Sequence, residues 1–139
     1  MSNVTQPDLA LLAFAREVQE KAYAPYSQFR VGAAVYTSDG SIFQGVNVEN
    51  AAYSAVICAE AAALCAAVSA GHREITAVAI VGDSDAPTAP CGAARQVLAE
   101  FNPEMRVIMG GQSEKVRVTT LGELYPDAFL RGNLDQKAE

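Results

Sequence analysis

The sequence predicts an α/β protein in which helices cover both faces of a central, mixed, five-stranded sheet. Two observations lead to this class: five short apolar segments typical of strands, and amphipathic segments between them that are typical of helices. A third is composition, because 50% of the 139 residues are hydrophobic, enough for a core without disulfide or metal cross-links. No repeat, linker or low-complexity segment is visible, so residues 1–139 are expected to form one domain.

The first half of the chain predicts a helix followed by a β-hairpin. Residues 7–22 form an amphipathic helix, and these side chains are expected to face the core: Leu9, Leu12, Phe14 and Val18. Residues 31–36 and 42–46 alternate in the manner of strands and are separated by an Asp-Gly turn.

The second half predicts two helices that alternate with buried strands. A helix is expected over residues 57–70, because Gly71 suits the position after a helix end. Residues 74–82 form the apolar run of a strand that is covered on both faces. The remaining elements are expected in this order: a helix over 91–101, strands within 105–110 and 115–120, and a short helix with a tail over 121–129.

Charge and hydropathy exclude several classes of protein. The formal net charge is −6 and the sequence pI is about 4.7, so the surface should repel a phosphate backbone, and no nucleic-acid partner is expected. No apolar run has the length of a membrane span, and residues 1–12 lack a basic leader followed by an apolar core. A cytoplasmic protein that does not bind membranes is therefore expected.

The three cysteines indicate thiol chemistry. An odd number of cysteines without an export signal favours reduced thiols, and one histidine is too few for an imidazole-based metal site. Cys58 and Cys91 begin two predicted helices, where free N–H groups favour a thiolate, and two such thiolates can converge on one zinc ion. Cys65 lies two turns after Cys58, too far to bind the same ion, and is expected to be a small buried side chain.

Each cysteine taken alone is better explained as a small buried apolar side chain, because free cysteine is among the most buried residue types. Glu60 favours the metal interpretation for Cys58, because it lies two residues later at the same helix start. A carboxylate there can complement the helix dipole, and beside a metal-bound water it can also carry protons.

Six segments, in the same order and at similar spacing, resemble the small homotetrameric cytidine deaminases. They are YAPYSQFRVGAA (23–34), NVENAAY (47–53), CAE (58–60), PCG (90–92), RQVL (95–98) and LGELYPDAF (121–129). Cys-x-Glu with Pro-Cys alone would also admit enzymes that edit nucleic acids, whereas NVEN with the first segment is specific to free nucleosides. The resemblance covers nearly the whole chain and implies the three-layer α/β/α fold of that family.

The resemblance implies a catalytic centre that deaminates cytidine or deoxycytidine hydrolytically. Cys58 and Cys91 would hold Zn2+, which lowers the pKa of a bound water. Glu60 would be the general acid and base, and the backbone N–H of Ala59 would donate to the carbonyl of the base.

The resemblance also implies a nucleoside-binding pocket shared between subunits. Asn47 and Glu49 would bind the ribose, and the ring of Phe29 would pack against the pyrimidine. From a neighbouring subunit of a homotetramer, the pocket would receive three further residues: Ala51, Tyr53 and Phe129.

The sequence departs from the family at two positions. The family has a third zinc-binding cysteine where this chain has Ala94, and usually an arginine where it has Ala61. Zinc with three thiolates carries −1, which an arginine offsets, whereas zinc with two thiolates is neutral. If a site worth about 10–16 kcal/mol loses one of four ligands, binding weakens by roughly 10²- to 10³-fold.

Three hypotheses account for these departures. The favoured one is a zinc-dependent cytidine deaminase of pyrimidine salvage whose site is weakened or completed by water. The second is a nucleoside-binding protein without turnover. The third is a Cys→Ala change introduced at position 94, which leaves Ala61 unexplained. An enzyme that edits nucleic acids is disfavoured by the net charge of −6. A purely structural role is disfavoured because it would give Glu60 no function.

Overall fold

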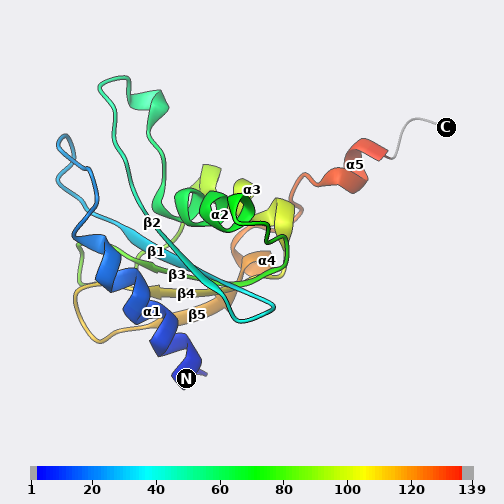
Figure 1. Cartoon of the computed structure of the whole chain (residues 1–139), viewed down its shortest axis with the longest axis horizontal. Helices are drawn as coiled ribbons and strands as arrows, with labels where there is room; N and C mark the ends of the chain where they lie inside the picture. Colours follow the sequence, from blue (N-terminus) through cyan, green and yellow to red (C-terminus); the bar gives the residue numbers. More distant parts are fainter. Residues whose placement is uncertain (1–2, 136–139) are drawn as a thin grey trace.

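The computed structural model describes residues 3–135, and it has the predicted α/β architecture with helices on both faces of one sheet (Figure 1). The two ends of the predicted domain, residues 1–2 and 136–139, lie outside the described residues.

The elements follow the predicted order. They are α1 (Gln6–Gln19), β1 (Gly32–Thr37), β2 (Ile42–Val46), the 3₁₀ helix η1 (Tyr53–Ala55), α2 (Ala59–Ser69), β3 (Ile75–Val81), α3 (Gly92–Phe101), β4 (Arg106–Gly110), β5 (Arg117–Thr120), α4 (Leu121–Leu124) and α5 (Arg131–Asp135). The first helix ends at Gln19 rather than at residue 22, and α5 extends the predicted tail.

The sheet is mixed and has the strand order β2-β1-β3-β4-β5. The hairpin of β1 and β2 is antiparallel, and β1 also pairs antiparallel with β3. Strands β3 and β4 are parallel and are joined through α3, whereas β5 returns antiparallel to β4. The predicted apolar strand, β3, therefore lies at the centre of the sheet.

Helix α1 covers one face of the sheet. The side chains that it packs against the sheet are only partly the expected ones. Leu12 and Ala15 are fully buried, whereas Leu9 and Phe14 are 41% and 40% exposed, so the predicted inward face was wrong for these two. The reason is close backbone approach: a Cβ on Gly32 would lie 2.1 Å from the Ala15 carbonyl oxygen. Small residues allow this approach, and they determine which face of the helix packs.

Helices α2, α3 and α4 cover the opposite face, where the larger of two apolar cores lies. Gly45 of β2 sets the position of α2, since a Cβ there would lie 2.3 Å from the backbone nitrogen of Ala63 and 2.7 Å from the carbonyl oxygen of Ala59. The N-terminal turn of α2 therefore rests directly on the sheet, which fixes the place of Cys58 and Glu60.

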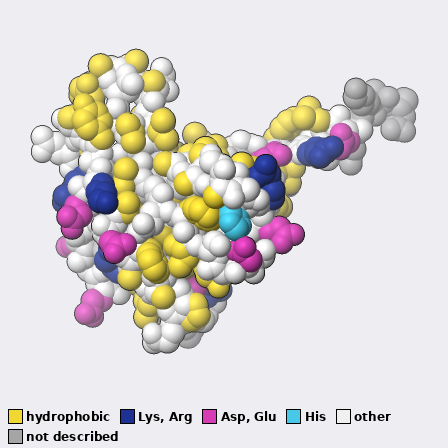
Figure 2. Space-filling view, viewed as in Figure 1, with side chains coloured by type: hydrophobic (Ala, Val, Ile, Leu, Met, Phe, Trp, Pro, Cys, Tyr) yellow, Lys and Arg dark blue, Asp and Glu magenta, His cyan; other side chains and the backbone are white. Residues whose placement is uncertain are grey.

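Two loops project from the sheet beside one another (Figure 1). They comprise residues 20–31 and 47–58. A bridge from Tyr23 to Val48 joins the two loops, and a bridge from Val48 to Ile57 closes the second loop on itself. The rings of Tyr26 and Tyr53 meet edge to face, with centroids 6.1 Å apart. Apolar side chains gather on this projection in Figure 2. In the described part of the chain, no helix has the length and apolar character that crossing a membrane requires.

Candidate active site

Two thiols meet where α2 and α3 begin. Cys58 is the N-cap residue of α2 and Cys91 is the N-cap residue of α3. Their Sγ atoms lie 2.9 Å apart, and neither side chain caps its own helix by a hydrogen bond. The structure thus brings together the two cysteines that the helix starts predicted.

Glu60 lies in the first turn of α2 and is only 4% exposed. Burial raises the pKa of its carboxyl group, while the backbone N–H groups of Glu60 and Cys91 act in the opposite direction. A carboxyl group with a raised pKa, held beside two thiols, is suited to accept and return a proton.

Burial, the hydrogen bond with Cys91 and the charge of Glu60 together raise the pKa of the Cys58 thiol to about 12. In the metal-free protein, burial thus opposes the thiolate that the helix start is expected to favour at Cys58. A cation bound to the sulfur would reverse this balance.

The Cys58 and Cys91 thiols have the chemistry that zinc prefers, but they supply only two of the three protein ligands of a usual catalytic zinc site. Two adjacent thiols are preferred zinc ligands, and catalytic zinc sites normally have three protein ligands. Ala94, one helical turn after Cys91, is 1% exposed and offers only a methyl group. Among the residues that the structure describes, no group of three His, Cys, Asp or Glu side chains is placed to hold a metal ion.

Asn47 and Phe29 are linked by hydrogen bonds. The Asn47 side chain accepts from the Val31 N–H at 2.9 Å and donates to the Phe29 carbonyl at 2.9 Å. The Phe29 ring lies over Gly82, where a Cβ would approach it to 2.8 Å. Asn47 therefore fixes the loop that carries Phe29.

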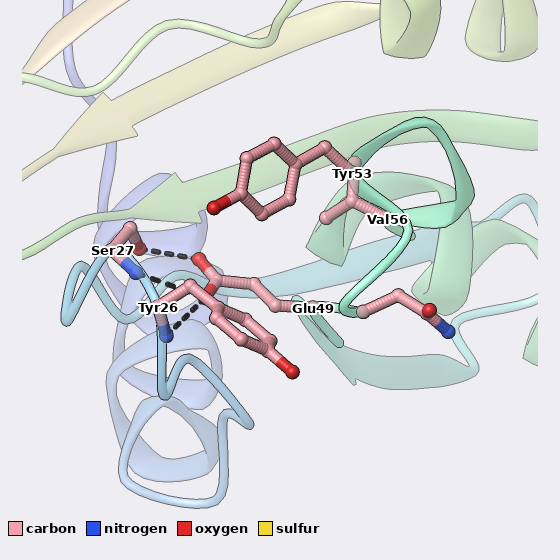
Figure 3. Close-up of a pocket in the computed structure, with 6 residues that line it drawn as sticks. Tyr26, Ser27, Glu49, Tyr53 and Val56 are labelled. Carbon is pink, nitrogen blue, oxygen red and sulfur yellow. Dashed lines mark hydrogen bonds between the residues drawn. The ribbon is translucent and has the colours of Figure 1, made fainter.

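Glu49 lies in a pocket of about 350 Å³ between the two projecting loops (Figure 3). Its carboxylate accepts from the N–H groups of Tyr26 at 2.9 Å and Ser27 at 3.0 Å, and from the Ser27 hydroxyl. Hydrogen bonds from Ser27, above all from its hydroxyl, lower the pKa of Glu49, so the carboxylate stays ionised. The rings of Tyr26 and Tyr53 flank it.

The three residues expected to serve a neighbouring subunit are all exposed. Ala51 and Tyr53 lie on the projecting loop, and Tyr53 is 77% exposed. Phe129, 56% exposed, lies on the segment that leads to α5, which extends away from the other side of the molecule (Figure 1). Their exposure is what a contact with another subunit would require.

Sequence reasoning missed two supporting residues. The Arg95 guanidinium donates to the Pro90 carbonyl at 2.9 Å and to the Leu124 carbonyl at 2.6 Å, so it braces the turn before Cys91. Ser27 holds Glu49. Both residues lie within the motifs RQVL and YAPYSQFRVGAA, but motif spacing alone does not tell a supporting residue from one that binds a ligand.

Comparisons with known proteins identify the family of the chain. Residues 5–110 match the family described as the cytidine and deoxycytidylate deaminase zinc-binding region. The cytidine deaminase of Sporosarcina psychrophila is 45% identical over 130 residues, which cover 93% of this chain and 96% of that protein.

Solved structures show the same fold. The crystal structure of cytidine deaminase from Burkholderia pseudomallei has a TM-score of 0.85 at 50% identity and covers 91% of this chain and 100% of that one. The Mycobacterium tuberculosis cytidine deaminase has a TM-score of 0.77 at 37% identity and covers 91% and 98%.

The fold and the matched relatives place the chain among the hydrolytic deaminases. Within that class, the chain belongs to the cytidine deaminase family.

Proposed function

We propose that this chain hydrolyses cytidine and deoxycytidine to uridine and deoxyuridine with release of ammonia, and that it serves pyrimidine salvage. The observation that carries the proposal is the buried Glu60 carboxyl group beside the paired sulfurs of Cys58 and Cys91. Family membership supports the reaction, since the relatives named above are cytidine deaminases.

Cys58 and Cys91 would hold a Zn2+ ion, whose chemical contribution is a bound water acidic enough to act as a nucleophile near neutral pH. With two thiolates the site would be neutral, and Ala94 would supply no third protein ligand. We expect zinc to bind roughly 10²- to 10³-fold more weakly than to three thiolates.

Glu60 carries the protons. Its carboxylate would take one proton from the water that attacks C4 and deliver it to the ring nitrogen N3. It would then take the second proton from the hydroxyl group now on C4 and deliver it to the amine, which leaves as ammonia when the C4–N bond breaks. Burial suits it to this exchange, because a carboxyl group with a raised pKa gives up its proton less readily to solvent. The N–H of Ala59, in the first turn of α2, has no partner within the helix and would donate to the base carbonyl.

The substrate is a free nucleoside, bound through both of its halves. Asn47 and Glu49 would contact the ribose hydroxyls, and Phe29 would pack against the base. Hydrogen bonds already hold both polar side chains in place, which lowers the ordering cost of binding. The remaining contacts would come from another subunit of a homotetramer, through Ala51, Tyr53 and Phe129. Residues 1–139 would act as a single domain.

A second candidate is a nucleoside-binding protein without turnover. The observation that favours it is Ala94, which leaves no third donor within the described residues.

One experiment separates the two candidates. Protein supplied with zinc is incubated with cytidine, uridine and ammonia are quantified, and cytidine binding is measured by calorimetry on the same sample. We expect stoichiometric uridine and ammonia, with loss of turnover when a chelator is added. Cytidine binding without uridine, at full zinc occupancy, would establish the second candidate instead.

A further inference from the structure

We propose that Cys58 and Cys91 form a reversible disulfide when the protein meets a peroxide, so that this pair is an oxidation site. The proposal concerns the metal-free pair and does not depend on deaminase activity. It rests on the separation, exposure and surroundings of the two sulfurs.

The sulfurs are already close to bonding distance. They lie 2.9 Å apart as free thiols. A disulfide bond is about 2.05 Å long, and two thiolates that share a tetrahedral zinc ion at about 2.3 Å each would lie about 3.8 Å apart. The observed separation falls between these values. A combined shift of less than about 1 Å therefore forms the disulfide, and a similar shift in the other direction admits a metal ion.

The two cysteines differ in exposure, and this sets the order of reaction. Cys91 is exposed and Cys58 is partly buried, so peroxide meets Cys91 first. The Cys91 sulfur attacks a peroxide oxygen, the O–O bond breaks, and a sulfenic acid and water form. The Cys58 sulfur then attacks the Cys91 sulfur and displaces the hydroxyl group, which leaves as water with the Cys58 proton. One peroxide is reduced to two waters, and the two thiols are oxidised to one disulfide.

Because Ala94 replaces a third thiol, the Cys58–Cys91 pair should form the disulfide more readily. A metal ion held by two sulfurs is released more readily than one held by three, so the thiols are more often free of metal. The methyl group of Ala94 cannot compete for the oxidised sulfur. A thiol at that position would instead offer an alternative partner one turn from Cys91.

Cys65 supplies an internal control. It is exposed on α2, two turns beyond Cys58, so the expectation that it is buried was wrong. Any exposed thiol can be oxidised, but Cys65 has no cysteine beside it comparable to the Cys58–Cys91 pair. Reaction at Cys65 should therefore add oxygen rather than form a disulfide within the chain.

The test treats reduced, metal-free protein with a small molar excess of hydrogen peroxide and reads the intact mass and the number of reactive thiols. The wild-type chain should lose two hydrogens, and its three reactive thiols should fall to one. Proteolysis without reductant should yield a Cys58–Cys91 cross-linked peptide, and reductant should restore all three thiols. Cys65→Ser should form the same disulfide, whereas Cys58→Ser should gain oxygen at Cys91.

A zinc arm, read by mass rather than by activity, completes the test. Prior loading with zinc should slow the loss of hydrogen, because the metal and the disulfide need the same two sulfurs. Oxygen addition to wild-type protein without hydrogen loss would overturn the proposal, and so would a cross-link that includes Cys65. Peptide mapping of the wild-type chain decides this even if Cys58→Ser fails to fold.

Discussion

Ala94 is the residue that most affects the chemistry of the site. It lies one turn from Cys91 and is almost fully buried, so its side chain is directed into the protein near the paired thiols. Ala61, beside Glu60, likewise lacks the charge that a third thiolate would need. The two alanines would leave the proposed zinc site neutral, because two thiolates would balance the charge of the ion.

At this residue, Ala94→Cys is expected to raise zinc affinity by roughly 10²- to 10³-fold, because it supplies a third thiolate one helical turn from Cys91. Competition with a chromogenic chelator measures the change. Ala93→Cys is the matched control, since Ala93 is the exposed neighbour on the same helix. An equal gain from both variants, or none from Ala94→Cys, would contradict the assignment of position 94.

The arginine is expected to matter only once the third thiolate is present. Ala94→Cys alone gives the zinc site a charge of −1, which makes the bound water less acidic. Adding Ala61→Arg should offset this charge, and cytidine turnover of the double variant should exceed that of the single variant. Initial rates at matched zinc occupancy test this, and a double variant slower than the single one would refute the charge argument.

Among the elements, the contact of β2 with α2 fixes the catalytic helix. Gly45→Ala is expected to destabilise the protein by about 1–3 kcal/mol, because the new Cβ would overlap the α2 backbone. Urea unfolding measures the effect, with Gly92→Ala as the control, since a Cβ at Gly92 meets nothing within 4 Å. Similar stabilities for the two variants would show that α2 does not rest on Gly45.

The start of α1 is coupled to β4 by an ion pair. Asp8 closes a capping box with Thr5, and its buried carboxylate accepts from Arg106 at 2.7 and 2.8 Å. The hydrogen bond from Arg106 lowers the pKa of Asp8 below its ordinary value of 3.8. The resulting stability is therefore complete above about pH 4 and is lost as the pH falls through the folded-state pKa.

Asp8→Asn is expected to cost about 1–3 kcal/mol at pH 7, because it leaves Arg106 without its charged partner. The loss should be smaller at acid pH, as the pH falls below 3.8 and through the lowered pKa of Asp8, because the wild-type carboxylate then takes up a proton. Denaturant midpoints at pH 7 and at acid pH measure this, and Asp85→Asn, at an exposed aspartate, serves as the control. A pH-independent loss would contradict the ionic contribution.

The sequence was enough to predict which segments form helices and which form strands. It was a poorer guide to which side of a helix is buried. All five strands and the thiols at two helix starts follow from periodicity and capping, which are local properties. The inward face of α1 was missed because large apolar residues such as Phe14 dominate a hydropathy pattern. The actual face is set by contact of Ala15 with Gly32, which lies on a distant strand. The exposure of Cys65 was missed for a similar reason, since burial depends on packing rather than on residue type.

In the whole molecule, exposed apolar residues on the projecting loops support the proposed homotetramer. Tyr53 is 77% exposed, Tyr23 is 55% exposed and Tyr26 is 50% exposed, and in Figure 2 apolar side chains gather on this projection. Light scattering at micromolar concentration should give about four times the 14.6 kDa mass of one chain. Tyr53→Asp should reduce that mass, whereas Tyr36→Asp, at an exposed tyrosine on β1, should not. A monomeric wild-type protein would rule out the shared pocket.

The candidate site could be predicted only in its parts. The motifs supplied Cys58, Cys91 and Glu60, because each lies at a helix start that the sequence reveals. The contacts of Glu49 with the backbone of Tyr26 and Ser27 could not be inferred, since they join loops more than twenty residues apart. The raised pKa of Cys58 was equally hidden, because it depends on how deeply the thiol is buried.

The most direct test of the proposed function is the ultraviolet absorbance of cytidine over time, with zinc-loaded wild-type protein and Glu60→Gln compared at equal zinc occupancy. The substitution keeps the size of the side chain but removes its ability to exchange a proton. We expect the wild-type chain to convert cytidine to uridine, and Glu60→Gln to be slower by at least about 10²-fold, as for loss of a general acid and base. Equal rates for the two proteins, or no conversion by the fully loaded wild-type chain, would contradict deamination through Glu60.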